Sequence, residues 1–156
     1  MDNQSKKSIN TGNTTNIEYH RYFQLLDMFV QEGAIFQMHP QILHFGSYDN
    51  RHYSISKYNL RFGFTYSIFN PSTSQEKDRT RKDVFAFSLK DGSSIKGNDN
   101  KTTYVLLSLN TKVKLTDLLR PDLCGYKGKM NEETLKQYRK AKKDFVESKQ
   151  NKRKAT

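Results

Sequence analysis

Histidine and acidic side chains are the first residues to test for catalytic chemistry. The chain has 4 His, and His44 and His52 flank the polar segment Asp49-Asn50-Arg51. If residues 42–48 and 52–58 pair as a hairpin, the two imidazoles reach adjacent strands, an arrangement suited to acid–base catalysis or to half a metal site. Their spacing matches no recognised metal motif, and the sequence has no phosphate-binding glycine loop, no G-x-S-x-G and no HExxH. We expect no catalytic residue, no metal and no cofactor; a small hydrolase using His44 and His52 is an alternative.

The single cysteine and the lack of long apolar runs bear on the compartment. Cys124 excludes an internal disulfide and a cysteine-based zinc site, which favours a reducing compartment. No apolar run approaches the ~20 residues of a membrane span, so we expect no membrane partner. The polar N-terminus has no apolar signal region. Two basic clusters, one at 140–143 and one at 152–154, resemble a split nuclear-import signal, so we expect a nuclear protein.

Positive charge dominates the composition. The formal net charge is +11 and the sequence pI is about 9.7, which favours an acidic partner such as nucleic acid, a ribonucleoprotein or an anionic protein surface. Residues 136–154 alone have nine Lys or Arg against Asp144 and Glu147. A solvated helix face that keeps the protein soluble explains this run equally well.

Aromatic residues with basic neighbours are typical of surfaces on which bases stack and cations neutralise phosphates. Lys57-Tyr58-Asn59-Leu60-Arg61 is the densest such cluster, and a polar, basic loop follows at 70–82. The rings of Phe62, Phe64 and Tyr66 share one face of a predicted strand with Leu60 and Ile68, so we assign them to the core. The predicted nucleic-acid-binding residues are Lys57, Tyr58, Arg61, Lys77, Arg79, Arg81 and Lys82.

Helical patterns occur near both ends of the chain. Thr15-Asn16-Ile17-Glu18 is typical of a capping box, and apolar residues then recur at helical spacing, which predicts a helix over 16–32 that ends before Gly33. Asn131 predicts the cap of a second helix that runs to about Lys149. Its narrow apolar seam indicates docking on one surface, either of a larger protein subunit or of the chain's own barrel. The seam residues predicted to bind a partner are Leu135, Tyr138, Phe145 and Val146.

Between the helices the hydrophobic pattern is that of strands, so we predict a mainly β fold. Asn70-Pro71-Ser72 is expected to end the third strand, because proline cannot donate to a ladder. A short helical turn is expected at 116–119. Five or so strands suit a small OB-like β-barrel with flanking N-terminal and C-terminal α-helices, and a half-open sheet is the alternative. The predicted strands are 42–48, 52–58, 60–68, 84–89 and 103–109.

The domain organisation follows from these elements. We expect a disordered tail over 1–14, a single OB-like domain with terminal helices over 15–149, and a basic tail over 150–156. Arg61 to Tyr66 also resembles part of the aromatic signature of RNA-recognition motifs. That fold requires a helix between its first two strands, and residues 34–60 offer no pattern for one.

Residues 42–49, Ile-Leu-His-Phe-Gly-Ser-Tyr-Asp, and the helix from Asn131 resemble features of the small single-OB-fold subunits of single-strand-binding complexes. Examples are the smallest subunit of the telomeric CST complex and the small subunit of replication protein A. The resemblance is one of layout over roughly residues 42–149. It implies a C-terminal helix that pairs with the larger OB partner, and so a partner-binding role for the seam residues.

The leading functional hypothesis is therefore a non-catalytic accessory subunit of a nucleic-acid-associated complex of the telomere or single-strand-binding type. It would bind a larger protein subunit through its C-terminal helix and help to hold single-stranded DNA or RNA. A structural component of a large ribonucleoprotein or cytoskeletal assembly is the alternative from another class.

Overall fold

The computed structural model describes residues 23–44, 50–95 and 101–155, with the backbone alone for 76, 77 and 152–155. The predicted tail at 1–14, the predicted start of the first helix and Gly46 to Asp49 lie outside the described residues. A helix covers 23–29, and α5 runs over Glu132–Ala155, beyond its predicted end at Lys149. Within the described ranges, no helix combines the length and the apolar character needed to cross a bilayer.

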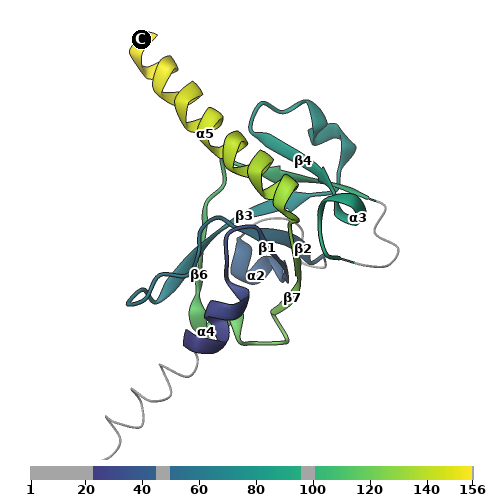
Figure 1. The fold of residues 1–156 in the computed structure, drawn as a ribbon, viewed down its shortest axis with the longest axis vertical. Helices are drawn as coiled ribbons and strands as arrows, with labels where there is room; N and C mark the ends of the chain where they lie inside the picture. Colours follow the sequence, from purple (N-terminus) through teal and green to yellow (C-terminus); the bar gives the residue numbers. More distant parts are fainter. Residues whose placement is uncertain (1–22, 45–49, 96–100, 156) are drawn as a thin grey trace, which may run out of the picture.

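The chain is mainly β, in line with the sequence prediction, and forms one sheet of antiparallel strands consistent with an OB-like fold, although the sheet is not closed (Figure 1). The strand order is β4-β5-β3-β2-β1-β7, and β6 pairs with β3 beside β5. The strands are β1 Ala34–Met38, β2 His52–Ser56, β3 Tyr66–Thr73, β4 Val84–Ser88, β5 Thr102–Leu106, β6 Thr111–Lys114 and β7 Cys124–Lys129. The short helices are α2 Pro40–Leu43, η1 Glu76–Thr80, α3 Leu89–Gly92 and α4 Leu115–Leu118.

Strand β3 is the longest and connects both halves of the sheet. One edge pairs with β2, and the other pairs with β6 through Phe69 and with β5 from Ser72 onward. Pro71 lies where this second edge changes partner, so its missing N–H falls at a break between two ladders. The strand therefore continues through Pro71, and the prediction that Asn70-Pro71-Ser72 ends it was wrong.

The two ends of the sheet approach each other without forming a full ladder. An isolated bridge joins Ser93 to Met130, just after β7. The Ser94 N–H donates to Lys129 O at 2.9 Å, and the Asn131 N–H donates to Gly92 O at 3.0 Å. The segment after α3 thus partly covers the edge of β7, and the arrangement matches the half-open alternative.

The sheet is buried on both faces, which explains why its first strand lacks an alternating pattern. In β1, Phe36 and Met38 belong to a core with the helix at 23–29, α2 and α4, while Ile35 belongs to a second core beneath α5. A strand buried on both faces reads as a continuous apolar run. The sequence therefore predicts no strand at 34–38. The strand predicted at 42–48 is wrong in the part that the structure describes, because Ile42 and Leu43 belong to α2. The strand opposite β2 is β1, with Met38 facing His52.

Helix α5 packs against its own domain. Asn131 caps it as predicted, since its Oδ1 accepts from the Thr134 N–H at 2.9 Å. Tyr138 is fully buried, and its ring lies 5.8 Å from that of Phe85 in β4. The hydroxyl of Tyr138 donates to Asn70 Oδ1 in β3 at 2.5 Å. The seam of α5 thus docks in cis on the β3–β4 half of the sheet.

Candidate nucleic-acid interface

The loop between β2 and β3, residues 57–65 (the β2–β3 loop), projects from the body of the domain at the left of Figure 1. Its tip is a tight turn in which Gly63 has a φ of +91°, a conformation that favours glycine, and the Phe64 N–H donates to Arg61 O at 3.3 Å. The loop is anchored at Leu60, which is buried and whose N–H donates to Val30 O at 2.9 Å.

Two rings predicted to lie in the core are on the surface of this loop. Phe62 is 64% exposed and Phe64 is 41% exposed, because the alternating pattern of 60–68 runs across the turn and only its second half is strand. The edge of the Phe62 ring meets Phe23 at 5.0 Å. The assignment of Phe62 and Phe64 to the core was therefore wrong, and both rings are accessible to a partner.

Tyr58 lies at the base of the β2–β3 loop with cations around its ring. The Lys57 and Lys142 ammonium groups are each 5.4 Å from the ring centroid, and the Arg61 guanidinium is at 5.7 Å. The ring is nevertheless 43% exposed. The three predicted residues Lys57, Tyr58 and Arg61 are thus brought together, and α5 supplies a fourth member through Lys142.

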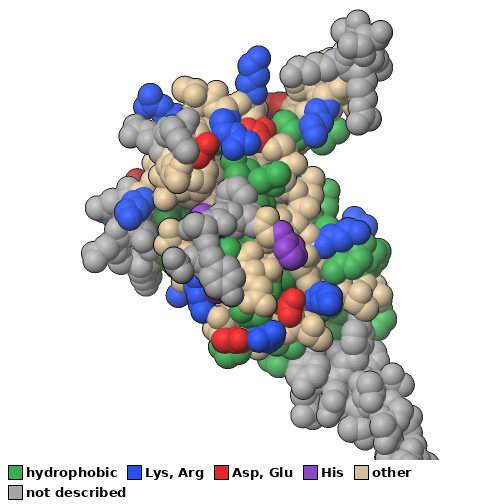
Figure 2. Space-filling view, turned by 180° about the vertical axis from the view of Figure 1, so that it is seen from behind, with side chains coloured by type: hydrophobic (Ala, Val, Ile, Leu, Met, Phe, Trp, Pro, Cys, Tyr) green, Lys and Arg blue, Asp and Glu red, His purple; other side chains and the backbone are tan. Residues whose placement is uncertain are grey.

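The same alternation of cations and rings continues along the loop. Arg61 lies 6.0 Å from the Phe64 ring, Phe64 meets the Tyr66 ring edge-on at 5.8 Å, and Lys112 of β6 lies 4.9 Å from the Tyr66 ring. A pocket of about 240 Å³ opens among Tyr58, Asn59, Arg61, Phe64 and Tyr66. We call Lys57, Tyr58, Arg61, Phe64, Tyr66 and Lys112 the cation–aromatic surface. Figure 2 shows Lys or Arg side chains beside hydrophobic ones at this edge of the molecule.

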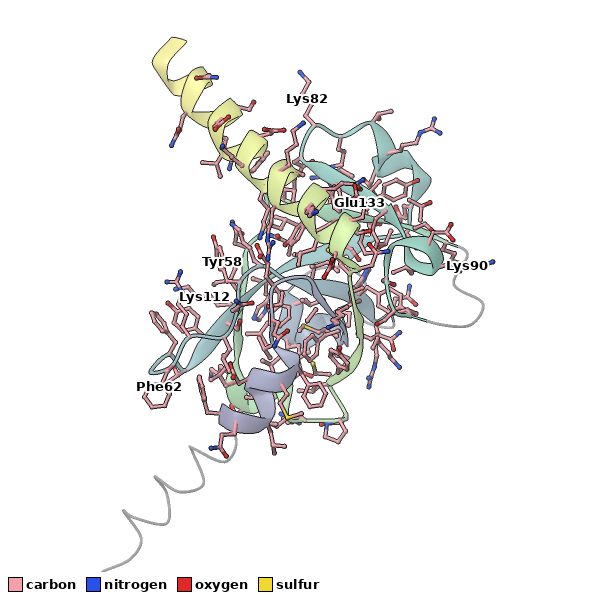
Figure 3. All side chains as sticks on the ribbon, in the orientation of Figure 1. Tyr58, Phe62, Lys82, Lys90, Lys112 and Glu133 are labelled. Carbon is pink, nitrogen blue, oxygen red and sulfur yellow. The ribbon has the colours of Figure 1, made fainter. Side chains whose placement is uncertain are left out.

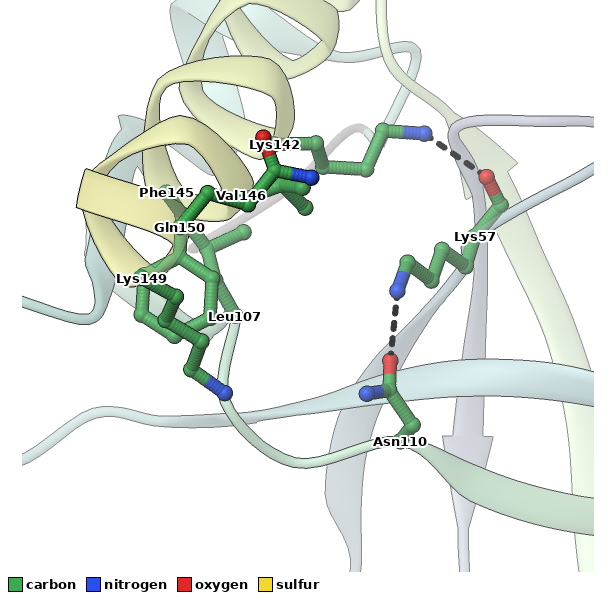
Figure 4. Close-up of a pocket in the computed structure, with 8 residues that line it drawn as sticks. All are labelled: Lys57, Leu107, Asn110, Lys142, Phe145, Val146, Lys149 and Gln150. Carbon is green, nitrogen blue, oxygen red and sulfur yellow. Dashed lines mark hydrogen bonds between the residues drawn. The ribbon is translucent and has the colours of Figure 1, made fainter. Parts of the chain in front are cut away.

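A second pocket, of about 190 Å³, adjoins this surface at Lys57 (Figure 4). We call it the lysine pocket. It lies between the distal half of α5 and the turn that connects β5 to β6. The residues that line it are Lys57, Leu107, Asn110, Lys142, Phe145, Val146, Lys149 and Gln150.

An ion-pair network holds Lys142 between the two pockets. Its Nζ donates to Glu32 Oε2 at 2.5 Å and to Lys57 O at 2.7 Å, while Arg139 Nε donates to Glu32 Oε1 at 2.6 Å. Burial raises the pKa of Glu32, but the hydrogen bonds from Lys142 and Arg139 outweigh it, so the pKa lies below its ordinary value. Burial lowers the pKa of Lys142, and Glu32 opposes this shift. Glu32 thus fixes α5 beside the β2–β3 loop.

No protein-family model and no curated protein matches this sequence.

The other predicted nucleic-acid-binding residues lie elsewhere. Arg79, Arg81 and Lys82 belong to or follow η1, and Figure 3 shows Lys82 far from Tyr58, Lys112 and Phe62, which share one side of the molecule. Arg81 donates to both carboxylate oxygens of Asp83, at 2.9 and 2.8 Å. The side chain of Lys77 lies outside the described residues. The basic loop therefore does not join the cation–aromatic surface.

The residues of the predicted partner-binding seam differ in how deeply they are buried. Tyr138 is completely buried in the chain's own core, so its side chain offers nothing to a partner, and its assignment to a partner interface was wrong. Leu135 and Phe145 are partly buried against the same core. Val146 is 49% exposed and is the seam residue that reaches the surface.

The residues considered for catalysis are not arranged as predicted. His44 ends α2 with a φ of +52°, and so does not lie on a strand beside His52. Burial raises the pKa of Cys124 to about 12, which leaves a neutral thiol at physiological pH. No group of three or more His, Cys, Asp or Glu suited to a metal ion occurs among the residues that the structure describes.

The sequence alone does not identify Phe64, Tyr66 and Lys112 as members of the cation–aromatic surface. Nor does it identify Lys142 and Lys149 as members of the adjoining lysine pocket. Only tertiary structure brings β6 and α5 to the β2–β3 loop, and a lysine on a basic helix gives no sign of which ring it meets. One signal was present: Gly63 interrupts an alternating run, a pattern that indicates a turn as well as a strand.

Proposed function

We propose that this protein is a non-catalytic accessory subunit that binds single-stranded nucleic acid through the cation–aromatic surface. Exposed rings accept unstacked bases, and cations beside them neutralise the phosphates that connect those bases. Single strands fit this chemistry better than duplexes, since their bases are free to leave the stack and lie on a ring.

The observation that carries the proposal is the environment of Tyr58. Its ring is 43% exposed, although three cations from two separate elements lie within cation–π distance of it. A lysine-rich surface that serves only for solubility does not require an aromatic residue at its centre. An aromatic ring that serves only for core packing does not require cations around it. The combination suits a ligand that has both a π face and negative charge.

The proposal is tested by replacing Tyr58 with leucine, which keeps an apolar side chain and removes the π face. Affinity for a fluorescent single-stranded oligonucleotide, measured by anisotropy, should fall about tenfold, since stacking on one aromatic residue is worth roughly 1–3 kcal/mol. Tyr126→Leu is the matched control, because Tyr126 is 40% exposed on β7, away from the cation–aromatic surface. Equal affinity of the Tyr58 and Tyr126 variants would contradict the proposal.

The accessory role is supported by the distal part of α5. The helix continues to Ala155 and projects beyond the body of the domain (Figure 1). Val146, in the distal half of this helix, is exposed. We place the contact with a larger protein subunit on this part of α5. Val146→Asp should release that subunit in co-purification from native cells, and its retention would place the contact elsewhere.

A further inference from the structure

We infer that the lysine pocket is a phosphate-binding site. The inference deepens the proposed function and rests on it for the source of the phosphate, which we assign to the bound strand. The evidence for the site itself is that hydrogen-bond donors around the pocket point into it.

Asn110 is the residue that decides the character of the pocket. Its Oδ1 accepts from Lys57 Nζ at 2.8 Å and from Asn70 Nδ2 at 3.3 Å, so the oxygen is turned toward two donors. The amide nitrogen must then point the other way, and Figure 4 shows it directed across the pocket toward Lys149. An asparagine fixed in this way presents N–H donors to whatever fills the space.

The two lysines beside Asn110 are donors as well, while Gln150 has both a donor and an acceptor. Lys57 and Lys149 bring ammonium groups to the same opening, and an ammonium has three donors and no acceptor. Lys142 is turned away toward Glu32 and the Lys57 carbonyl, and the Glu32 carboxylate is engaged by Lys142 and Arg139. None of the described residues that line the pocket has a carboxylate. A site in which donors and positive charge predominate selects an anion rather than a cation.

Size and the apolar wall favour a phosphate that is part of a nucleotide. The volume of about 190 Å³ corresponds to roughly six waters at ~30 Å³ each, enough for a tetrahedral oxyanion with part of its sugar. Leu107 and Phe145 form an apolar wall, and Lys149 lies 4.6 Å from the Phe145 ring. Because Lys57 lines this pocket and its ammonium also lies 5.4 Å from the Tyr58 ring, a strand with a phosphate here can place its neighbouring base near Tyr58.

The test uses the full chain, inorganic phosphate and single charge changes. Asn110→Asp keeps an oxygen for Lys57 and Asn70 and turns the donor into an acceptor. Lys149→Gln removes an ammonium from the opening. Lys143→Gln is the matched control, since it makes the same charge change at an exposed position of α5 outside the pocket lining. Phosphate binding is followed by NMR through the backbone amides of the residues that line the pocket, and also through the Asn110 side-chain amide in the chains that keep it. The ionic strength is held constant with chloride.

Phosphate should shift the Asn110 amide in the wild-type chain. Asn110→Asp should weaken phosphate binding by about tenfold and Lys149→Gln by about threefold, while Lys143→Gln stays within about twofold of wild type. Equal weakening by Lys143→Gln and Lys149→Gln, or unchanged binding by Asn110→Asp, would overturn the site. A folded spectrum of each variant verifies that the change is local.

A second titration with an oligothymidylate of about ten nucleotides separates this inference from the proposed function. Weaker binding of the oligonucleotide by Asn110→Asp supports both. Phosphate binding in the pocket without any oligonucleotide binding refutes the proposed function and leaves the anion site standing. If Asn110→Asp leaves the affinity for the oligonucleotide unchanged, the assignment of the phosphate to the bound strand is refuted.

Discussion

Asn70 is a buried polar residue in the middle of β3, and both ends of its amide are used. Its Nδ2 donates to Leu109 O at 2.9 Å, and its Oδ1 accepts from the Tyr138 hydroxyl at 2.5 Å. One side chain thus connects the central strand, the turn before β6 and α5. A buried amide of this kind costs free energy unless every group finds a partner, so it specifies how α5 sits on the sheet.

Tyr138→Phe should lower the free energy of unfolding by about 1–2 kcal/mol, because Asn70 Oδ1 loses its donor while remaining buried. Urea denaturation measures the change. Tyr126→Phe, at an exposed ring on β7, should change stability by less than about 0.5 kcal/mol. Equal stability of the two variants would show that the hydroxyl bond contributes nothing.

Glu32→Gln should destabilise the protein near neutral pH by about 1 kcal/mol, because screening limits a partly exposed ion pair. The pKa of Glu32 is lowered in the folded chain, so its contribution is present above its ordinary value of 4.5 and is lost as the pH falls through the folded pKa. The difference between wild type and variant should therefore shrink in acid. A difference that is constant with pH would contradict this ion-pair role.

At the scale of elements, local signals predicted some segments well. The strands at 84–89 and 103–109, the helical turn near 116–119 and the helix capped by Asn131 are confirmed by β4, β5, α4 and α5. Strands β4 and β5 are rich in β-branched and aromatic residues, and α5 has a cap in its own sequence. Strand β1 lacks an alternating pattern because it is buried on both faces, and β7 is Cys-Gly-Tyr-Lys-Gly-Lys, in which glycine and lysine predominate.

The choice between docking of α5 in cis and in trans could not be made from its seam, because an apolar stripe does not identify the surface that covers it. Leu135→Asp distinguishes the two on the isolated chain. It should lower the free energy of unfolding by about 3 kcal/mol, since it places a charge against the core. Val146→Asp should cost less than about 0.5 kcal/mol at its exposed position. Similar small effects of both changes would argue against docking in cis.

At the scale of the whole molecule, the net charge of +11 favours an acidic partner but does not indicate which part of the surface such a partner would contact. Part of the interface is predicted on the basic loop at 77–82 because that loop has a high density of positive charge. The fold instead gathers cations and rings along the β2–β3 loop, β6 and α5, where contacts between distant segments decide the surface.

Salt should control binding if this surface contacts phosphates. With Lys57, Arg61, Lys112 and Lys149 each meeting a phosphate, the plot of log affinity against log salt should have a slope of roughly −3 for a single strand. Affinity should then fall about 60-fold for a fourfold rise in salt. Lys112→Gln should make the slope less steep by roughly 0.7.

The most direct measurement is an NMR titration of the isotope-labelled chain with a single-stranded oligonucleotide. The account predicts that the largest shifts fall on residues 57–66, on Lys112 and on the part of α5 that lines the lysine pocket, with small shifts at 79–82. Saturable shifts centred on 79–82, or no shift at all at low salt, would contradict it.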